Sequence, residues 1–160
     1  MSPDGYATYI NDHLAGSVAA IELLDHLCQA AQGTERETLL LGLQRDIEED
    51  QAVLRQLLKE LGGTESKFRK VAAWLTEKIG EAKLKLDDRG SGELQWLEAL
   101  ETLGLGIHGK LGLWRALETV RDRKPELQSL DLERLKSRAL DQYGRVEAER
   151  IRVARRALSD

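Results

Sequence analysis

Strong helix breakers occur at only four places between long periodic segments in this chain of 160 residues. They are Gly33, the Gly62-Gly63 pair, the Gly90-Ser91-Gly92 turn and Lys124-Pro125. Glycine interrupts helices because it lacks a Cβ atom, and proline because it lacks a backbone N–H. The segments between the breakers therefore predict helices over residues 4–32, 34–61, 64–86, 91–122 and 130–158.

The composition favours one all-α domain over residues 1–160. Hydrophobic residues make up 41% of the chain and charged residues 32%, whereas aromatics make up only 4%. Leucine, alanine and long charged side chains favour helices, while a shortage of aromatic and β-branched residues disfavours sheets. A net charge of -4 in a leucine-rich chain is not typical of a disordered protein.

The lengths of the connections predict two antiparallel hairpins. A minimal loop at Gly33 joins the first two predicted helices, and Thr34 is expected to cap the second of them. The last two predicted helices are joined near Pro125. Residues 64–86 form an amphipathic segment that is long enough, with its flanks, to cross back along a helix of about 42 Å at about 1.5 Å per residue. Simple up-and-down packing with an added helix is the alternative.

Ionisable side chains lie on the apolar faces of three predicted helices. Asp50 lies almost on the midline of a leucine stripe, and Arg150 lies near the centre of an apolar arc with Glu147 beside it. His13 follows the line of Ser17, Ala20 and Leu24. Because an unpaired buried charge costs several kcal/mol, these groups are expected to pair, to change protonation state or to hold an ion.

Two interpretations of His13, Asp50, Glu147 and Arg150 follow. The first is a buried ion-pair cluster that fixes the register of the helices and needs no cofactor. The second is a metal site in which His13, Asp50 and Glu147 bind iron, manganese or zinc through nitrogen and oxygen donors. We favour the first interpretation, with no metal expected.

The layout and the mid-bundle acids resemble the ferritin-like superfamily, whose di-metal members carry inward carboxylates and Glu-x-x-His pairs. The resemblance implies a four-helix bundle of two antiparallel hairpins with an additional connecting helix. The matching positions read IEED at 47–50 and EAER at 147–150, so neither ends in histidine and the metal site is degenerate. The segments NDHLAG at 11–16 and GIHGKLGLWR at 106–115 are also similar to a bacterial family of helical proteins that carries no established activity.

Glycines crowd the predicted helix over residues 91–122, at positions 104, 106, 109 and 112. Each costs up to about 1 kcal/mol relative to alanine, so close packing against the connecting helix or a twin subunit is expected in return. The alternative is a ligand groove formed by His108, Gly109, Gly112 and Trp114. Leu94, Leu105 and Leu113 lie off the main apolar stripe, and either the connecting helix or homodimerisation would cover them.

The remaining expectations concern compartment, partners and activity. A single cysteine, Cys28, and the absence of a signal-like or membrane-spanning run predict a cytoplasmic protein that does not enter a membrane. Acidic residues interleave with the arginines near the C-terminus, so nucleic-acid binding is not expected. We expect a non-enzymatic structural or interaction role, with a ferritin-like metal-binding or oxidative-stress function as the alternative.

Overall fold

The computed structural model describes residues 5–63, 77, 79–81 and 92–159. These residues form helices, turns and loops, and they contain no strand. The chain divides into two compact units, Met1–Ile79 and Gly80–Asp160. The all-α prediction is therefore confirmed for the described part of the chain.

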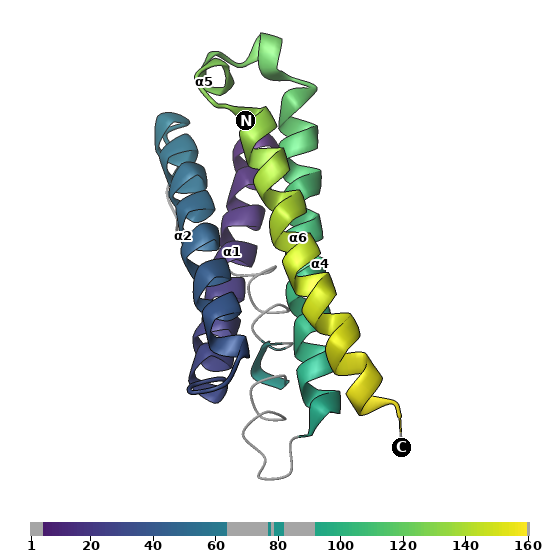
Figure 1. Ribbon diagram of the computed structural model, residues 1–160. Helices are drawn as coiled ribbons and strands as arrows, with labels where there is room; N and C mark the ends of the chain where they lie inside the picture. The colour runs from purple at the N-terminus through teal and green to yellow at the C-terminus, as the bar shows by residue number, and fades with distance from the viewer. Residues whose placement is uncertain (1–4, 64–76, 78, 82–91, 160) are drawn as a thin grey trace. The chain divides into compact units, whose positions relative to one another are not determined.

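The first unit contains an antiparallel hairpin of α1 (Gly5–Ala30) and α2 (Arg36–Glu60), drawn in purple and blue in Figure 1. The Gln51 amide donates a 3.1 Å hydrogen bond to Ser17 Oγ near the middle of the helices. Closer to the turn, the Gln44 amide donates to Asp25 Oδ1. From the first hydrogen bond to the second, the residue number rises in α1 and falls in α2. The two helices therefore run antiparallel.

The turn between α1 and α2 depends on a glycine with positive φ. Gly33 has φ +76°, a conformation that residues with a Cβ rarely adopt. Its N–H donates a 2.9 Å hydrogen bond to Glu37 Oε2, and Thr34 Oγ1 accepts a 3.3 Å hydrogen bond from the Arg36 N–H. The expected cap at Thr34 is therefore wrong by one residue, because the N-cap of α2 is Glu35 and its side chain forms no cap hydrogen bond.

The second unit contains α4 (Glu93–Glu118), the 3₁₀ turn η2 (Arg121–Arg123), the short α5 (Pro125–Gln128) and α6 (Leu132–Ala157). Contacts between α4 and α6 show that they are antiparallel, because Lys136 binds Glu118 near one end and Arg150 binds Glu101 nearer the other. Asp131 caps α6 by accepting a 3.0 Å hydrogen bond from the Arg134 N–H. Pro125 stands at the first position of α5, where no backbone N–H is needed.

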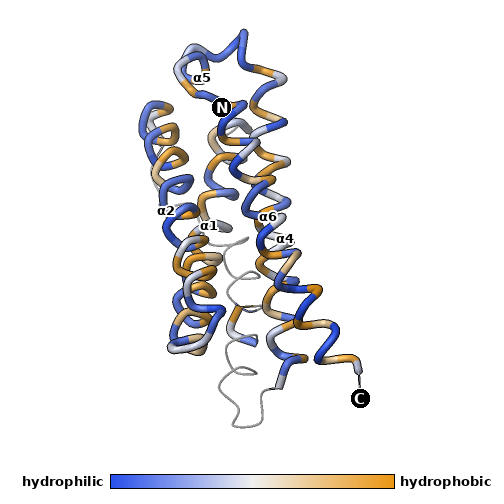
Figure 2. The backbone as a smooth tube through the Cα atoms, in the orientation of Figure 1, coloured by the Kyte–Doolittle hydropathy of each residue, from blue (hydrophilic) through white to orange (hydrophobic). Residues whose placement is uncertain are grey.

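Apolar and polar residues alternate around the helices at helical spacing, as the orange and blue bands of Figure 2 show. The buried residues of α1 and α2 are mostly leucine, isoleucine and alanine, and those of α4 include the fully buried Trp114. Burial of each large apolar side chain contributes about 1.5–3 kcal/mol. The leucine-rich composition thus supplies the buried surface of both units.

Three expectations about the predicted helices are changed by the structure or fall outside its described residues. The predicted helix over 91–122 ends at Glu118, and η2 and α5 occupy the connection before α6. The predicted helix over 64–86 falls mostly outside the described residues. Within it the structure describes residues 77 and 79–81, which are helical. Of the three leucines set off the main stripe of α4, Leu113 is fully buried, whereas Leu94 and Leu105 are exposed. The crossover and the single domain stay predictions.

Candidate binding groove

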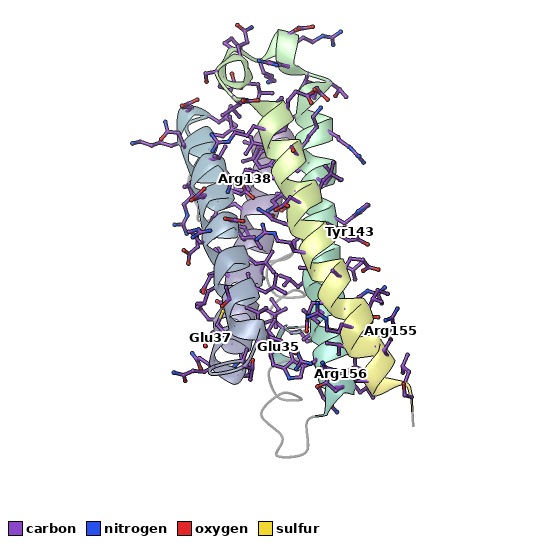
Figure 3. The ribbon with its side chains drawn as sticks, viewed as in Figure 1. Glu35, Glu37, Arg138, Tyr143, Arg155 and Arg156 are labelled. Atoms are coloured by element: carbon purple, nitrogen blue, oxygen red, sulfur yellow. The ribbon has the colours of Figure 1, made fainter. Side chains whose placement is uncertain are left out.

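An open groove of about 450 Å³ lies between α4 and α6. Its lining is Leu100, Glu101, Gly104, Leu105 and His108 of α4 and Tyr143, Val146, Glu147 and Arg150 of α6. The groove lies wholly within the second unit, and Tyr143 is labelled on α6 in Figure 3. Its volume is within the range of about 300–1,000 Å³ that is typical of ligand pockets.

The apolar part of the groove combines a small residue with a protruding one. A Cβ atom added to Gly104 would lie 3.8 Å from both Tyr143 and Val146, which is ordinary van der Waals contact. Leu100, one turn before Gly104 in α4, is buried, whereas Leu105, the residue after Gly104, is 76% exposed. The groove therefore passes over a position without a side chain and is flanked by an exposed leucine.

Two rings meet across the groove. The His108 imidazole and the Tyr143 phenol ring are 5.9 Å apart between centroids, with an interplanar angle of 60°. This edge-to-face arrangement brings the positive edge of one ring toward the negative face of the other. The contact joins α4 to α6 at the groove.

A three-residue ion-pair network forms the charged end of the groove. Arg150 donates to both oxygens of Glu147, with Nε–Oε2 and Nη2–Oε1 distances of 2.7 Å, and its Nη1 lies 3.3 Å from Glu101 Oε1. Hydrogen bonding to Arg150 lowers the pKa of Glu147, and the reciprocal bond raises the pKa of Arg150. Because both groups stay charged, the network fixes this end of the groove at neutral pH.

The four residues predicted as a buried polar cluster lie in different units. Glu147 and Arg150 are paired on α6, whereas His13 lies on α1 and Asp50 on α2. The Asp50 residue is 1% exposed, but the side chains of Arg150 and Glu147 are 27% and 36% exposed and line the groove instead of the core. Formation of one cluster by all four residues stays a prediction.

The buried polar positions of α6 are Gln142 and Glu149, which the sequence pattern did not single out. Lys110 of α4 donates a hydrogen bond to Gln142 Oε1, and Arg152 forms a 2.9 Å ion pair with Glu149. Glu149 precedes Arg150 by one residue, which is a rotation of about 100° around the helix. The sequence signal was the seven-residue spacing of Gln142 and Glu149, in phase with the buried Leu135.

His13 packs against a neighbouring tyrosine on α1. The His13 and Tyr9 rings are 4.7 Å apart between centroids and nearly perpendicular, at 78°. Burial lowers the pKa of His13, and the nearby Asp12 carboxylate partly opposes this effect. The imidazole is thus in an environment that favours its neutral form.

Of the residues predicted to form a ligand groove, His108 lines the α4–α6 groove, whereas Gly109, Gly112 and Trp114 do not. Trp114 is fully buried, and its indole N–H has no hydrogen-bond partner within the described part of the chain. Gly109 and Gly112 are exposed, and a Cβ atom added to either would meet nothing within 4 Å. The groove lies instead on the Gly104 side of His108, because that side of α4 faces α6.

Within residues 5–63, 77, 79–81 and 92–159, no group of three or more histidine, cysteine, aspartate or glutamate residues could hold a metal ion. Metal binding by His13, Asp50 and Glu147, suggested by the sequence, stays a prediction. No helix among the described residues is both long and apolar enough to cross a bilayer. The chain matches no protein-family model, and neither a curated protein nor a solved structure shows significant similarity to it.

Proposed function

We propose that this protein has a non-enzymatic structural or interaction role and that the α4–α6 groove is its binding surface. The observation that carries the proposal is the combination of an open groove of about 450 Å³ with the exposed Leu105 at its edge. Contiguous apolar surface beside ordered polar groups is typical of sites that bind other molecules.

The charged residues of the groove support binding over catalysis. Both oxygens of Glu147 accept hydrogen bonds from Arg150, and the same pairing lowers the pKa of this carboxylate. A carboxylate with a lowered pKa is a weak general base at neutral pH. Glu147 therefore positions Arg150, and the pair orients whatever lies in the groove.

A ferritin-like bundle is part of the same proposal. Two antiparallel hairpins, α1–α2 and α4–α6, are the halves from which such a bundle is built. In the second hairpin Arg150 forms an ion pair with Glu147. In a di-metal protein the carboxylate at this position would bind a metal ion instead. This pairing favours the structural role over the metal-binding alternative.

Fragment titration of the isotopically labelled full chain, followed by amide NMR shifts, tests the proposed surface. We expect apolar fragments to shift the amides of Gly104, Leu105, His108 and Tyr143 before those of other residues, because these residues line the groove. The Leu105→Arg variant should lose these shifts, whereas Leu41→Arg, at an exposed leucine of α2, should keep them. Fragments that bind only elsewhere, or that bind equally well to Leu105→Arg, would contradict the proposal.

A further inference from the structure

We propose that the exposed face of α4 binds a second copy of this chain, with the two α4 helices packed antiparallel about a two-fold axis. The inference rests on the proposed function, because it names the partner of the same groove. Three features of the face support it: a knob beside a hollow, complementary charge at its two ends, and glycines that packing among the described residues does not require.

One stripe of α4 is exposed along most of the helix. Its members recur at spacings of seven, four, three, four and three residues and are Leu94, Glu101, Leu105, His108, Gly112 and Arg115. Scattered exposed apolar residues are normal on protein surfaces. Here, however, Leu105 stands directly beside the hollow at Gly104. A two-fold axis between Leu105 and His108 would place the Leu105 knob of each copy opposite His108, which lines the groove of the other copy.

Charge along this face favours the antiparallel arrangement. Glu101 lies in the N-terminal half of the stripe and the exposed Arg115 in the C-terminal half, and the half-buried Glu98 lies on the same line, between Leu94 and Glu101. With the axis between Leu105 and His108, Arg115 of one copy lies opposite Glu98 of the other and within one turn of Glu101. Parallel packing would bring like charges together, and it would also align the two helix dipoles unfavourably.

The glycines of α4 supply the third argument. Glycine is the least favourable residue in a helix interior after proline. A Cβ atom at Gly109 or Gly112 would meet nothing within 4 Å, so packing within the described chain does not require glycine at either position. Close approach of another helix backbone is what a missing Cβ permits. Gly112 lies on the proposed face, whereas Gly106 is rotated away from it by about 100° or more.

Sedimentation equilibrium of the full chain over a range of concentrations tests the partner. We expect a mass that rises from 18.0 kDa to twice that value. Leu105→Arg should weaken association by about 30-fold or more, as for a central interface residue, while Leu41→Arg should not change it. Gly112→Ala should also weaken association, and Gly106→Ala, its matched control, should have no effect.

Two further variants and one distance test the antiparallel register. Arg115→Glu should weaken the dimer, and combining it with Glu98→Arg should restore association. Spin labels at Thr119→Cys, in a Cys28→Ser background, should be about 38 Å apart, since 25 residues of helix separate the two positions at about 1.5 Å per residue. A parallel pair would place the labels about 10 Å apart.

The possible outcomes separate this inference from the proposed function. A strictly monomeric mass, association unaffected by Leu105→Arg, or a label distance near 10 Å would overturn the antiparallel dimer. If fragments still bind the groove of a monomeric chain, the proposed function stands without this partner. If the chain is monomeric and the groove binds no fragment, both proposals fail.

Discussion

Arg150 binds Glu147 through two parallel hydrogen bonds, from Nε to Oε2 and from Nη2 to Oε1, each 2.7 Å long. The two residues are one helical turn apart on α6, and the same guanidinium reaches Glu101 on α4. Arg150 therefore connects a local pair to the neighbouring helix. This geometry makes the charge state of Glu147 relevant to the hairpin as a whole.

Glu147→Gln should reduce stability at neutral pH and lose that effect in acid. Pairing with Arg150 lowers the pKa of Glu147 in the folded chain, so the stabilisation is complete above the unfolded pKa of about 4.3 and is lost as the pH falls through the folded value. Urea unfolding of both proteins from neutral to acidic pH measures the difference. Arg150→Gln is the control, since it should remove the same acid-dependent stabilisation. A gap between wild type and Glu147→Gln that does not shrink in acid would refute this account.

His13 should make the protein less stable in mildly acidic solution. Burial lowers its pKa in the folded chain, so the unfolded state binds more protons as the pH falls below about 6.5. Stability is therefore complete above this pH and declines toward the lower folded pKa. His13→Phe keeps a ring beside Tyr9 and should not show this decline. NMR titration of the His13 ring measures the pKa directly, and a value of 6.5 or higher would exclude the explanation.

Cys28 should react slowly with iodoacetamide at neutral pH. Burial raises the pKa of its thiol, and the Asp25 and Glu37 carboxylates raise it further. Since the thiolate is the reactive form, the rate should be below that of a free cysteine peptide and should increase in alkaline solution. Glu37→Gln removes one negative charge and should accelerate alkylation. An equal or lower rate in this variant would show that the carboxylate does not act on the thiol.

Alanine substitutions at two glycines should have opposite effects on stability. At Gly106, in the interior of α4, an added Cβ would meet nothing within 4 Å, so Gly106→Ala should stabilise the chain by about 0.5–1 kcal/mol. At Gly33, where φ is +76°, Gly33→Ala should destabilise it by about 1–2 kcal/mol, although there is also open space around that position. Urea unfolding at neutral pH compares the two. Equal effects would mean that backbone conformation is not the deciding factor.

The described helices of both hairpins were predictable because their ends depend on local chemistry. Gly33 fixes the turn after α1, and Pro125 starts the short helix before α6. The end of α4 was predicted too late, since no glycine or proline marks it and η2 follows directly. The sequence also could not predict that Leu105 is exposed, because a leucine off the main apolar stripe can lie either on a covered face or on a solvent-exposed one.

The groove was only partly predictable from the sequence. His108 was identified as a candidate, but Glu101 and Tyr143 were not, although Glu101 is seven residues before His108 on the same face of α4. Gly109 and Gly112 were grouped with His108 by proximity in the sequence. The groove is formed instead by the residues of α4 that lie beside α6. Which residues these are depends on how two helices about 40 residues apart in the sequence pack together.

By itself the sequence determined the helical class, the two hairpins and the presence of ionisable groups near apolar stripes, because propensity, capping and periodicity are local properties of a chain. Only the tertiary structure decided which side of α6 is buried. Its apolar arc is wide enough to rotate by one residue, so the pattern allowed Arg150 to be central. Contacts with α4 set the rotation of α6 instead. Lys110 binds the buried Gln142, and Arg150 reaches Glu101 at the groove. A long-range hydrogen bond or ion pair selects one rotation of a helix, whereas hydrophobic periodicity defines that rotation only to within about one residue.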